Sequence, residues 1–240
     1  MKKIAWSWIL VLTFLAIIIA SVGAIYVILE FHKPEKDTVE FEILKSLLQI
    51  LTVLILGQII SLVVALFNYN RQKAEARREF QKYIVQRLIR VYVAVKSQRR
   101  LLRAKGLRPP YIGRIQANTY VAFDVFDKQM ELLNETELKL ETIRHEVEAS
   151  PDIFTDFREL TSYLKGMEDY LRELIKLYEQ KHALFSGKGS TVELDKLSLF
   201  PESTFSLRDF VGEAEDSKFV KEFSDLYDKA SEAITKSILK

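Results

Sequence analysis

The chain has 240 residues, which suffices for one medium domain or two small ones, and 35 Lys and Arg residues nearly balance 33 Asp and Glu residues. The 240 residues include no Cys, which excludes from them a disulfide framework, a thiolate metal site and a cysteine nucleophile. Its 8 Gly and 5 Pro are too few for a collagen-like or low-complexity protein.

Two long uncharged runs come first, and each is long enough to cross a membrane as a helix. They cover residues 4–29 and 46–67, and Gln49 and Gln58 are the strongly polar residues inside the second. The hydrocarbon core of a bilayer requires about 20 apolar residues. We therefore predict a transmembrane hairpin over residues 1–70. A cleaved signal peptide is the alternative for the first run, although its apolar part exceeds the usual length of about 7–15 residues.

Basic residues near the ends of the spans predict the orientation of this hairpin. The loop between the spans has Lys33 and Lys36 among four acidic residues, whereas five basic residues closely follow the second span. Lys and Arg next to a span favour the cytoplasmic side. We therefore predict an integral membrane protein with both termini and the long C-terminal part in the cytoplasm. From the compact topology alone we expect the membrane to be a prokaryotic inner membrane. The five basic residues are candidates for contact with anionic lipids: Arg71, Lys73, Arg77, Arg78 and Lys82.

Small residues recur at every fourth position of both spans, which is typical of closely packed membrane helices. The candidates for this packing are Ala16, Ala20 and Ala24 in the first span and Gly57, Ser61 and Ala65 in the second. Two interpretations remain open. The spans pack on each other within one chain, or they pack between protomers around a pore. Gln58 serves as an interhelical hydrogen-bonding group in the first case and as a pore-lining amide in the second.

Proline and glycine groups divide the remainder into four intervals of similar length, which we expect to be helices: 72–105, 114–149, 152–186 and 207–240. The third has an unbroken heptad of apolar residues: Phe157, Leu160, Leu164, Met167, Leu171, Leu174 and Tyr178. Ser150 before Pro151 indicates a helix start, as does Ser206 three residues before Asp209. No breaker lies between Gly57 and Gly106, so we expect the second span to continue into the first of these helices.

Short connections between helices of similar length favour antiparallel neighbours. The predicted fold class is therefore all-α: a two-helix transmembrane hairpin over 1–70, followed over 71–240 by a cytoplasmic antiparallel bundle of four long helices.

Charge is strongly segregated along the chain. Residues 71–114 have 14 basic and 2 acidic side chains, net +12, whereas residues 115–240 have 16 basic and 26 acidic side chains, net −10. The basic segment suits anionic lipids near the membrane, pairing with acidic helices of the same or another chain, or a phosphate-rich ligand. Nucleic acid is disfavoured because no recognised motif accompanies the charge. The candidates for charge pairing are Arg99, Arg100, Arg103, Lys105, Arg108 and Glu137.

Glu137 interrupts an apolar seam. If it is buried, it needs either a partner, for which Arg87 or Arg90 of a facing helix is the candidate, or a raised pKa. Catalytic and metal motifs are incomplete. Residues 186–191 lack the spacing of a phosphate-binding loop, and Ala149 stands where a second zinc-binding His would follow His145. Glu179 and His182 form a single Glu-x-x-His pair, whereas a di-iron bundle needs two.

We therefore predict no catalytic residue, metal or cofactor. The predicted function is that of a non-enzymatic membrane-anchored scaffold or interaction module. We expect it to self-associate or to bind a membrane-associated protein partner. The alternative is a subunit of an oligomeric pore or small ion channel gated through its cytoplasmic helices. An enzyme is a third possibility, and hydrolysis that depends on Glu137 or His182 would support it.

Overall fold

The computed structural model describes residues 39–111, 115–116, 118–199, 206–212 and 217–239. It also describes residues 19, 22–23 and 25–27 of the first predicted span, and residue 30 just after that span. The described residues are mostly helical, so the predicted class is confirmed at this level. The chain divides into two compact units, Met1–Ala74 and Glu75–Lys240. Of the residues singled out in the first predicted span, Ala16, Ala20 and Ala24 lie outside the described residues.

Helix α2 is continuous from Val39 to Leu101, a length of 63 residues. Its uninterrupted course follows from its composition, because it contains no proline and Gly57 is its single glycine. In the first unit most of its large apolar side chains are exposed to the surroundings, among them Val53 and Phe67. Burial in the protein interior therefore does not explain the apolar character of this part of α2.

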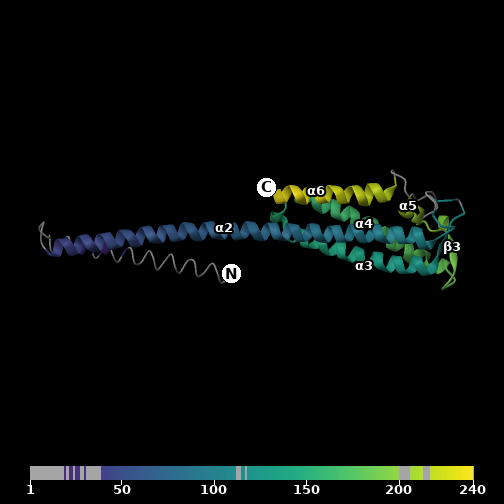
Figure 1. Cartoon of the computed structure of the whole chain (residues 1–240), viewed down its shortest axis with the longest axis horizontal. Helices are drawn as coiled ribbons and strands as arrows, with labels where there is room; N and C mark the ends of the chain where they lie inside the picture. The colour runs from purple at the N-terminus through teal and green to yellow at the C-terminus, as the bar shows by residue number, and fades with distance from the viewer. Residues whose placement is uncertain are drawn as a thin grey trace. The chain divides into compact units, whose positions relative to one another are not determined.

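The second unit is a helical bundle in which α3 (Phe123–Glu148), α4 (Phe157–Lys181) and α6 (Asp225–Leu239) accompany the C-terminal part of α2 (Figure 1). Helix α4 packs against both α3 and α6. A Cβ atom on Gly166 of α4 would lie 2.5 Å from Leu226 Cδ1, so glycine allows the close approach of these two helices.

The predicted apolar seams form the core of this bundle. From α2 it includes Ile84, Leu88, Val91 and Val95, and from α4 Leu160, Leu164, Met167, Leu171 and Leu174, all of them buried. Gln98 interrupts the α2 seam and is also buried, where its Nε2 donates a hydrogen bond to Thr136 Oγ1 of α3 at 3.2 Å. The heptad spacing therefore identified the interior face of these helices.

A small antiparallel sheet lies at the end of the bundle where Figure 1 labels β3. It consists of β1 (Leu107–Arg108), β2 (Tyr120–Ala122) and β3 (Thr191–Glu193), in the order β1-β2-β3. Val121 of β2 is opposite both Leu107 and Val192, and all three side chains are buried. The helix expected over 114–149 therefore begins later, at Phe123, because the preceding residues pair in this sheet.

The other helix boundaries also differ from the prediction. Pro151 opens a 3₁₀ turn, η2 (Pro151–Ile153), in which Ser150 makes no side-chain cap, so α4 begins at Phe157. The first expected helix ends in a π-helical turn, η1 (Leu102–Gly106), and the third in a 3₁₀ turn, η3 (His182–Leu184). A further 3₁₀ turn, η4 (Leu194–Lys196), follows β3.

The helix expected over 207–240 is divided into α5 (Leu207–Val211) and a π-helical turn, η5 (Val220–Ser224), that leads into α6. The start signal at Ser206 is confirmed, because its side chain accepts a hydrogen bond from the amide of Asp209 at 3.2 Å. The C-terminal glycine of α5, Gly212, has its amide bonded to the carbonyl of Arg208.

Candidate functional site

The apolar part of α2 is the first candidate for function. Among the described residues, one helix is long and apolar enough to cross a membrane. Its most apolar stretch of 18 residues has a mean hydropathy of 2.7, and no residue of that stretch is buried. The predicted packing or pore residues Gly57, Gln58, Ser61 and Ala65 lie on it and are all exposed. A Cβ atom on Gly57 would meet no heavy atom within 4 Å. The stripe of small residues is therefore accessible.

The five lipid candidates lie on α2 but differ in their surroundings. Arg77 Nε donates to the carbonyl of Ile153 at 2.7 Å, and Lys82 Nζ lies 3.1 Å from Glu79 Oε1. Arg71, Lys73 and Arg78 are exposed. Arg77 therefore has a structural role at the α3–α4 connection, which the sequence pattern did not indicate.

Two of the charge-pairing candidates bind the end of α5. Arg99 donates to the carbonyls of Phe210 and Gly212, and Arg103 donates to those of Val211 and Gly212, the last at 2.7 Å. The C-terminal carbonyls of a helix carry a partial negative charge that favours such cations. Side-chain charges alone could not reveal these acceptors, because they belong to the backbone.

The same two guanidinium groups also contact aromatic rings. Arg99 lies 4.2 Å from the centroid of Phe219, and Arg103 lies 5.3 Å from that of Tyr111. Asp209 of α5 accepts hydrogen bonds from the amides of Lys218 and Phe219 at 3.0 and 3.3 Å. Short helix α5 is thus joined both to α2 and to the chain that leads into α6.

The remaining basic candidates have different environments. Arg108 donates to the carbonyls of Lys105 and Leu107, both at 3.0 Å. Arg100 and Lys105 are exposed. The structure therefore brings Arg99 and Arg103 together at one point and leaves these three outside it.

Glu137 belongs to a buried ion cluster between α3 and α4, and its predicted pairing with Arg87 or Arg90 is wrong. Its Oε1 lies 3.5 Å from Arg172 Nη2 of α4. Arg87 instead forms an ion pair with Glu146. The physical reason is that the face of α3 that carries Glu137 packs against α4, and not against α2.

Glu168 is the centre of this cluster and is only 1% exposed. Its Oε2 accepts from Arg144 Nε at 2.6 Å, and its Oε1 accepts from Arg172. Arg144 also donates to Glu148 Oε1 at 2.7 Å, which lowers the pKa of the Glu148 carboxyl. Burial raises the pKa of Glu137, and the charge of Arg172 opposes that rise.

The two described histidines, His145 and His182, each lie beside carboxylates. His145 lies 3.6 Å from Glu141 and 3.3 Å from Glu148, and His182 Nε2 lies 3.5 Å from Asp127 Oδ1. Asp127 also accepts a hydrogen bond from Tyr178, and burial with this bond raises the pKa of Tyr178 to about 12. Across the described ranges, no group of three or more His, Asp and Glu side chains is arranged to hold a metal ion.

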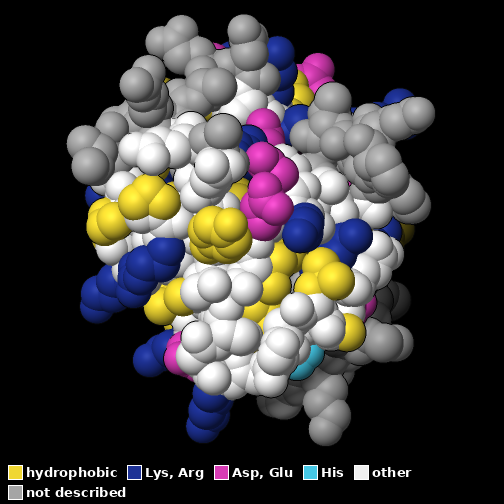
Figure 2. Space-filling view, turned by 90° about the vertical axis from the view of Figure 1, so that its right-hand side faces the viewer, with side chains coloured by type: hydrophobic (Ala, Val, Ile, Leu, Met, Phe, Trp, Pro, Cys, Tyr) yellow, Lys and Arg dark blue, Asp and Glu magenta, His cyan; other side chains and the backbone are white. Residues whose placement is uncertain are grey.

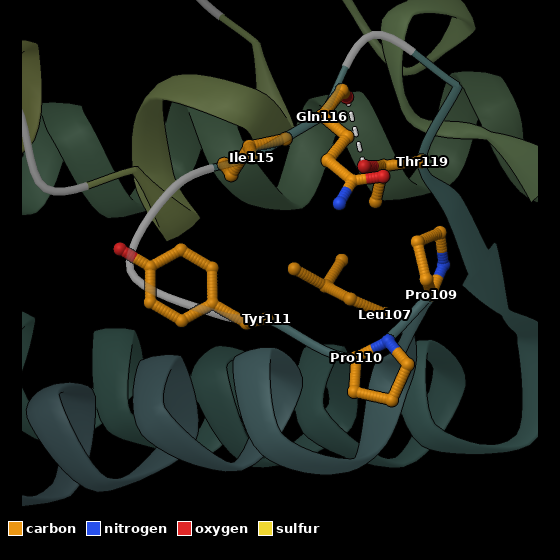
Figure 3. A pocket seen from close by; sticks show the side chains of 7 residues that line it. All are labelled: Leu107, Pro109, Pro110, Tyr111, Ile115, Gln116 and Thr119. Carbon is orange, nitrogen blue, oxygen red and sulfur yellow. Dashed lines mark hydrogen bonds between the residues drawn. The ribbon is translucent and has the colours of Figure 1, made fainter.

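At the sheet end of the bundle, side chains fill the space between the described residues. Leu107 lies at the centre of the space in Figure 3, and Thr119 Oγ1 donates to the carbonyl of Gln116 at 2.8 Å beside it. Figure 2 shows this end of the bundle from outside. Its apolar side chains form separate small patches between acidic and basic groups. The described part of this face is therefore not one continuous apolar surface.

A groove between α2 and α3 has a volume of about 330 Å³. Its lining combines three cations with apolar and small side chains: Arg87, Arg90, Val91, Ala94, Thr136, Lys139 and Ile143. The sequence pattern did not indicate this groove, because its two halves come from different helices.

Comparison of the chain with protein-family models, with curated proteins and with solved structures gave no match.

Proposed function

We propose that this chain is an integral membrane protein that acts as a non-enzymatic, self-associating scaffold. In this proposal residues 4–29 and 46–67 form a two-span hairpin, both termini are cytoplasmic, and four long antiparallel helices form the cytoplasmic bundle. The membrane is a prokaryotic inner membrane. The observation that carries the proposal is the accessible stripe of small residues on the apolar part of α2: Gly57, Ser61 and Ala65.

Small residues are important in a bilayer because no hydrophobic effect drives apolar side chains of two helices together in lipid. Helices associate there through close backbone packing and interhelical hydrogen bonds, and small side chains permit both. The Gln58 amide lies next to the stripe and needs a hydrogen-bond partner at membrane depth. A Gln58 amide of a second copy would satisfy that need, so the position of this amide is compatible with self-association.

The mass of the full chain in lipid nanodiscs, measured at low and at high salt, tests this proposal. We expect an oligomer at both salt concentrations. Gly57→Leu should shift it to monomer, because a large side chain separates the packed backbones. Val63→Leu, on the opposite side of the same helix, should leave the oligomer intact. A monomer at both salt concentrations would refute self-association, and an oligomer at low salt only would assign it to charge instead of the stripe.

The basic cluster after the span supports a further part of this proposal, contact with anionic lipid headgroups. Lys73 and Arg78 are exposed, and each basic side chain near an anionic surface contributes about 1 kcal/mol. We expect the chain to copurify with anionic lipids. Replacing Lys73 and Arg78 by Gln should lower the number of anionic lipids that copurify with each chain. Lys165→Gln in α4 is the control and should leave that number unchanged.

A subunit of an oligomeric pore is the second candidate function, and the polar residues on the apolar helix favour it. Gln58 and Ser61 are three residues apart and both are exposed, so they project from one side of α2. Thr52 differs from them, because its hydroxyl already donates to the carbonyl of Leu48 at 2.8 Å.

Conductance across a planar bilayer distinguishes the pore from the scaffold. If Gln58 and Ser61 line a pore, Gln58→Leu and Ser61→Leu should each reduce the conductance several-fold, whereas Thr52→Val should leave it unchanged. No conductance for the unmodified chain would leave the scaffold as the function.

A further inference from the structure

We propose that the groove between α2 and α3 binds a phosphorylated small molecule that has an apolar or aromatic body. The site is separate from the small-residue stripe and goes beyond the scaffold function. It lies wholly within the bundle, on helices that share one apolar core.

The two walls of the groove follow from helix periodicity. On α2 the lining residues Arg87, Arg90, Val91 and Ala94 are spaced i, i+3, i+4 and i+7, which places them on one face. On α3, Thr136, Lys139 and Ile143 are similarly spaced. Ala94 and Thr136 have short side chains, which leaves open the space that larger residues would fill. The volume of about 330 Å³ lies in the range of about 300–1,000 Å³ that is typical of small-molecule sites.

The charge of the rim selects an anion. Arg87 forms an ion pair with Glu146, which neutralises part of its charge, and it donates a 3.1 Å hydrogen bond to the hydroxyl of Tyr83. In the part of the chain that the structure describes, Arg90 makes no ion pair. Lys139 Nζ is 3.8 Å from Glu135 Oε2, and both side chains are about two-thirds exposed, so this pair neutralises Lys139 weakly.

The two guanidinium groups and the ammonium group of the lining suit an oxyanion, and phosphate is the one that we propose. Guanidinium groups form paired, parallel hydrogen bonds to phosphate, and an ammonium group adds a point charge. The apolar surface that a ligand can reach is the partly exposed Ala94 together with the hydrocarbon stems of the three cations, because Val91 and Ile143 beneath them are buried. A ligand that places an apolar body on this surface and a phosphate at the rim therefore matches both chemistries of the groove.

Two sources supply such a ligand: a soluble organic phosphate and the headgroup region of a phospholipid. Both present the same phosphate chemistry to Arg87, Arg90 and Lys139. The experiment therefore uses a soluble probe and varies the lipid separately.

The test is calorimetric titration of the full chain, in phosphatidylcholine nanodiscs, with 1-naphthyl phosphate and with inorganic phosphate. We expect naphthyl phosphate to bind at least about tenfold more tightly, because it also covers this apolar surface. Arg90→Gln and Lys139→Gln should each weaken binding about fivefold to tenfold, and Ala94→Leu should abolish it by filling the groove. Lys165→Gln, an exposed cation on α4, is the matched control and should bind like the unmodified chain.

Glu146→Gln provides a test of opposite sign. It removes the carboxylate that neutralises Arg87, so the affinity for naphthyl phosphate should rise severalfold. A loss of fold cannot cause tighter binding, so this variant separates the proposed site from general damage. Failure of naphthyl phosphate to bind, or equal binding by the Arg90→Gln and control variants, would overturn the proposal.

Repeating the titration in nanodiscs that contain phosphatidylglycerol identifies the source. If the headgroup occupies the groove, the apparent affinity for naphthyl phosphate falls for the unmodified chain, and Arg90→Gln removes this competition. If the affinity is unchanged, the ligand is a soluble phosphate. Either result supports binding of a phosphate group in the groove. This titration does not depend on the oligomer mass, which tests the scaffold proposal.

Discussion

At the scale of single residues, Glu168 shows how strongly the α3–α4 interface depends on one buried charge. It accepts hydrogen bonds from both Arg144 and Arg172. Glu168→Gln would remove the buried partner of Arg144, whose side chain is only 15% exposed, and breaking a buried ion pair costs about 3 kcal/mol or more. We expect the free energy of unfolding to fall by about that amount, measured by guanidinium unfolding of the full chain in nanodiscs.

Glu173 offers a matched control for this prediction on the same helix. Its carboxylate is 2.6 Å from Lys176 Nζ, but both side chains are substantially exposed to solvent. Exposed ion pairs contribute little, so Glu173→Gln should change the free energy of unfolding by less than about 0.5 kcal/mol. Equal losses for the two variants would show that burial does not decide the strength of the cluster.

Glu137 gives the same interface a dependence on pH. Its pKa is higher in the folded chain than the ordinary value of 4.5 because burial disfavours the charged carboxylate. The folded state therefore holds the proton more tightly than the unfolded state. The stabilisation from this proton is fully present below the unfolded pKa and is lost as pH rises through the folded pKa.

Glu137→Gln replaces the acid with a neutral group of the same shape, so it should remove this loss. We expect the variant to be more stable than the unmodified chain at pH 7, by about 1 kcal/mol or less, and equally stable near pH 4. Unfolding curves at pH 4, 5.5 and 7 measure the difference. A variant that is less stable at pH 7 would show that Arg172 contributes more than desolvation costs.

At the scale of elements, the short helix α5 is stabilised by contacts with neighbouring segments. A helix of five residues is too short to form alone, because nucleation costs more than its few hydrogen bonds return. Arg99 and Arg103 bind its terminal carbonyls, and Asp209 joins it to the residues before η5. These contacts replace the long hydrophobic face that α3, α4 and α6 possess.

Arg103→Met should therefore loosen α5 while preserving the helices of the bundle. A hydrogen bond to a charged group contributes about 1.5–3 kcal/mol, so amide hydrogen exchange over residues 207–212 should accelerate about tenfold or more. Exchange measured by mass spectrometry reports each segment separately. Arg100→Met, an exposed position on α2, should leave the exchange of α5 unchanged, and equal protection in both variants would contradict the role of Arg103.

Helix identity and interior faces were predictable because heptad spacing is a local property of the chain. Leu160, Leu164 and Met167 are buried as their spacing predicts. Strand β2 was not predictable, because three residues show no clear alternation and its partner β3 lies some seventy positions later in the chain. Heptad spacing also does not determine which helix packs against which face. Glu137 pairs with Arg172 because its face of α3 packs against α4.

At the scale of the whole molecule, charge segregation has more than one structural use. Net +12 over 71–114 and −10 over 115–240 suggest simple pairing of basic and acidic helices. The described contacts are more varied. Arg87 pairs with a carboxylate, Arg99 and Arg103 bind backbone carbonyls, and Arg90 lines the groove. Segment charge therefore predicts which surface attracts anions but does not identify the contact that each cation makes.

The proposed membrane orientation rests on the basic residues that follow the second predicted span, and the absence of Cys makes it directly testable. Lys36→Cys places a thiol in the loop between the predicted spans, and Ser162→Cys places one on the exposed side of α4. Because basic residues follow the second span, we expect the loop outside and α4 inside. In intact cells a membrane-impermeant maleimide should label Lys36→Cys alone, and both variants should react after permeabilisation.

Each labelling pattern has a distinct physical meaning. Labelling of Ser162→Cys alone in intact cells would mean that the hairpin is inserted in the opposite direction, against the charge asymmetry. Labelling of both before permeabilisation would show that α4 is accessible from outside and would refute a cytoplasmic bundle. If the chain is cut between the first apolar run and position 36, and Ser162→Cys stays unlabelled in intact cells, the first apolar run is a signal peptide. In that case the second span still orients the bundle inward, because Arg71, Lys73 and Arg77 follow it directly.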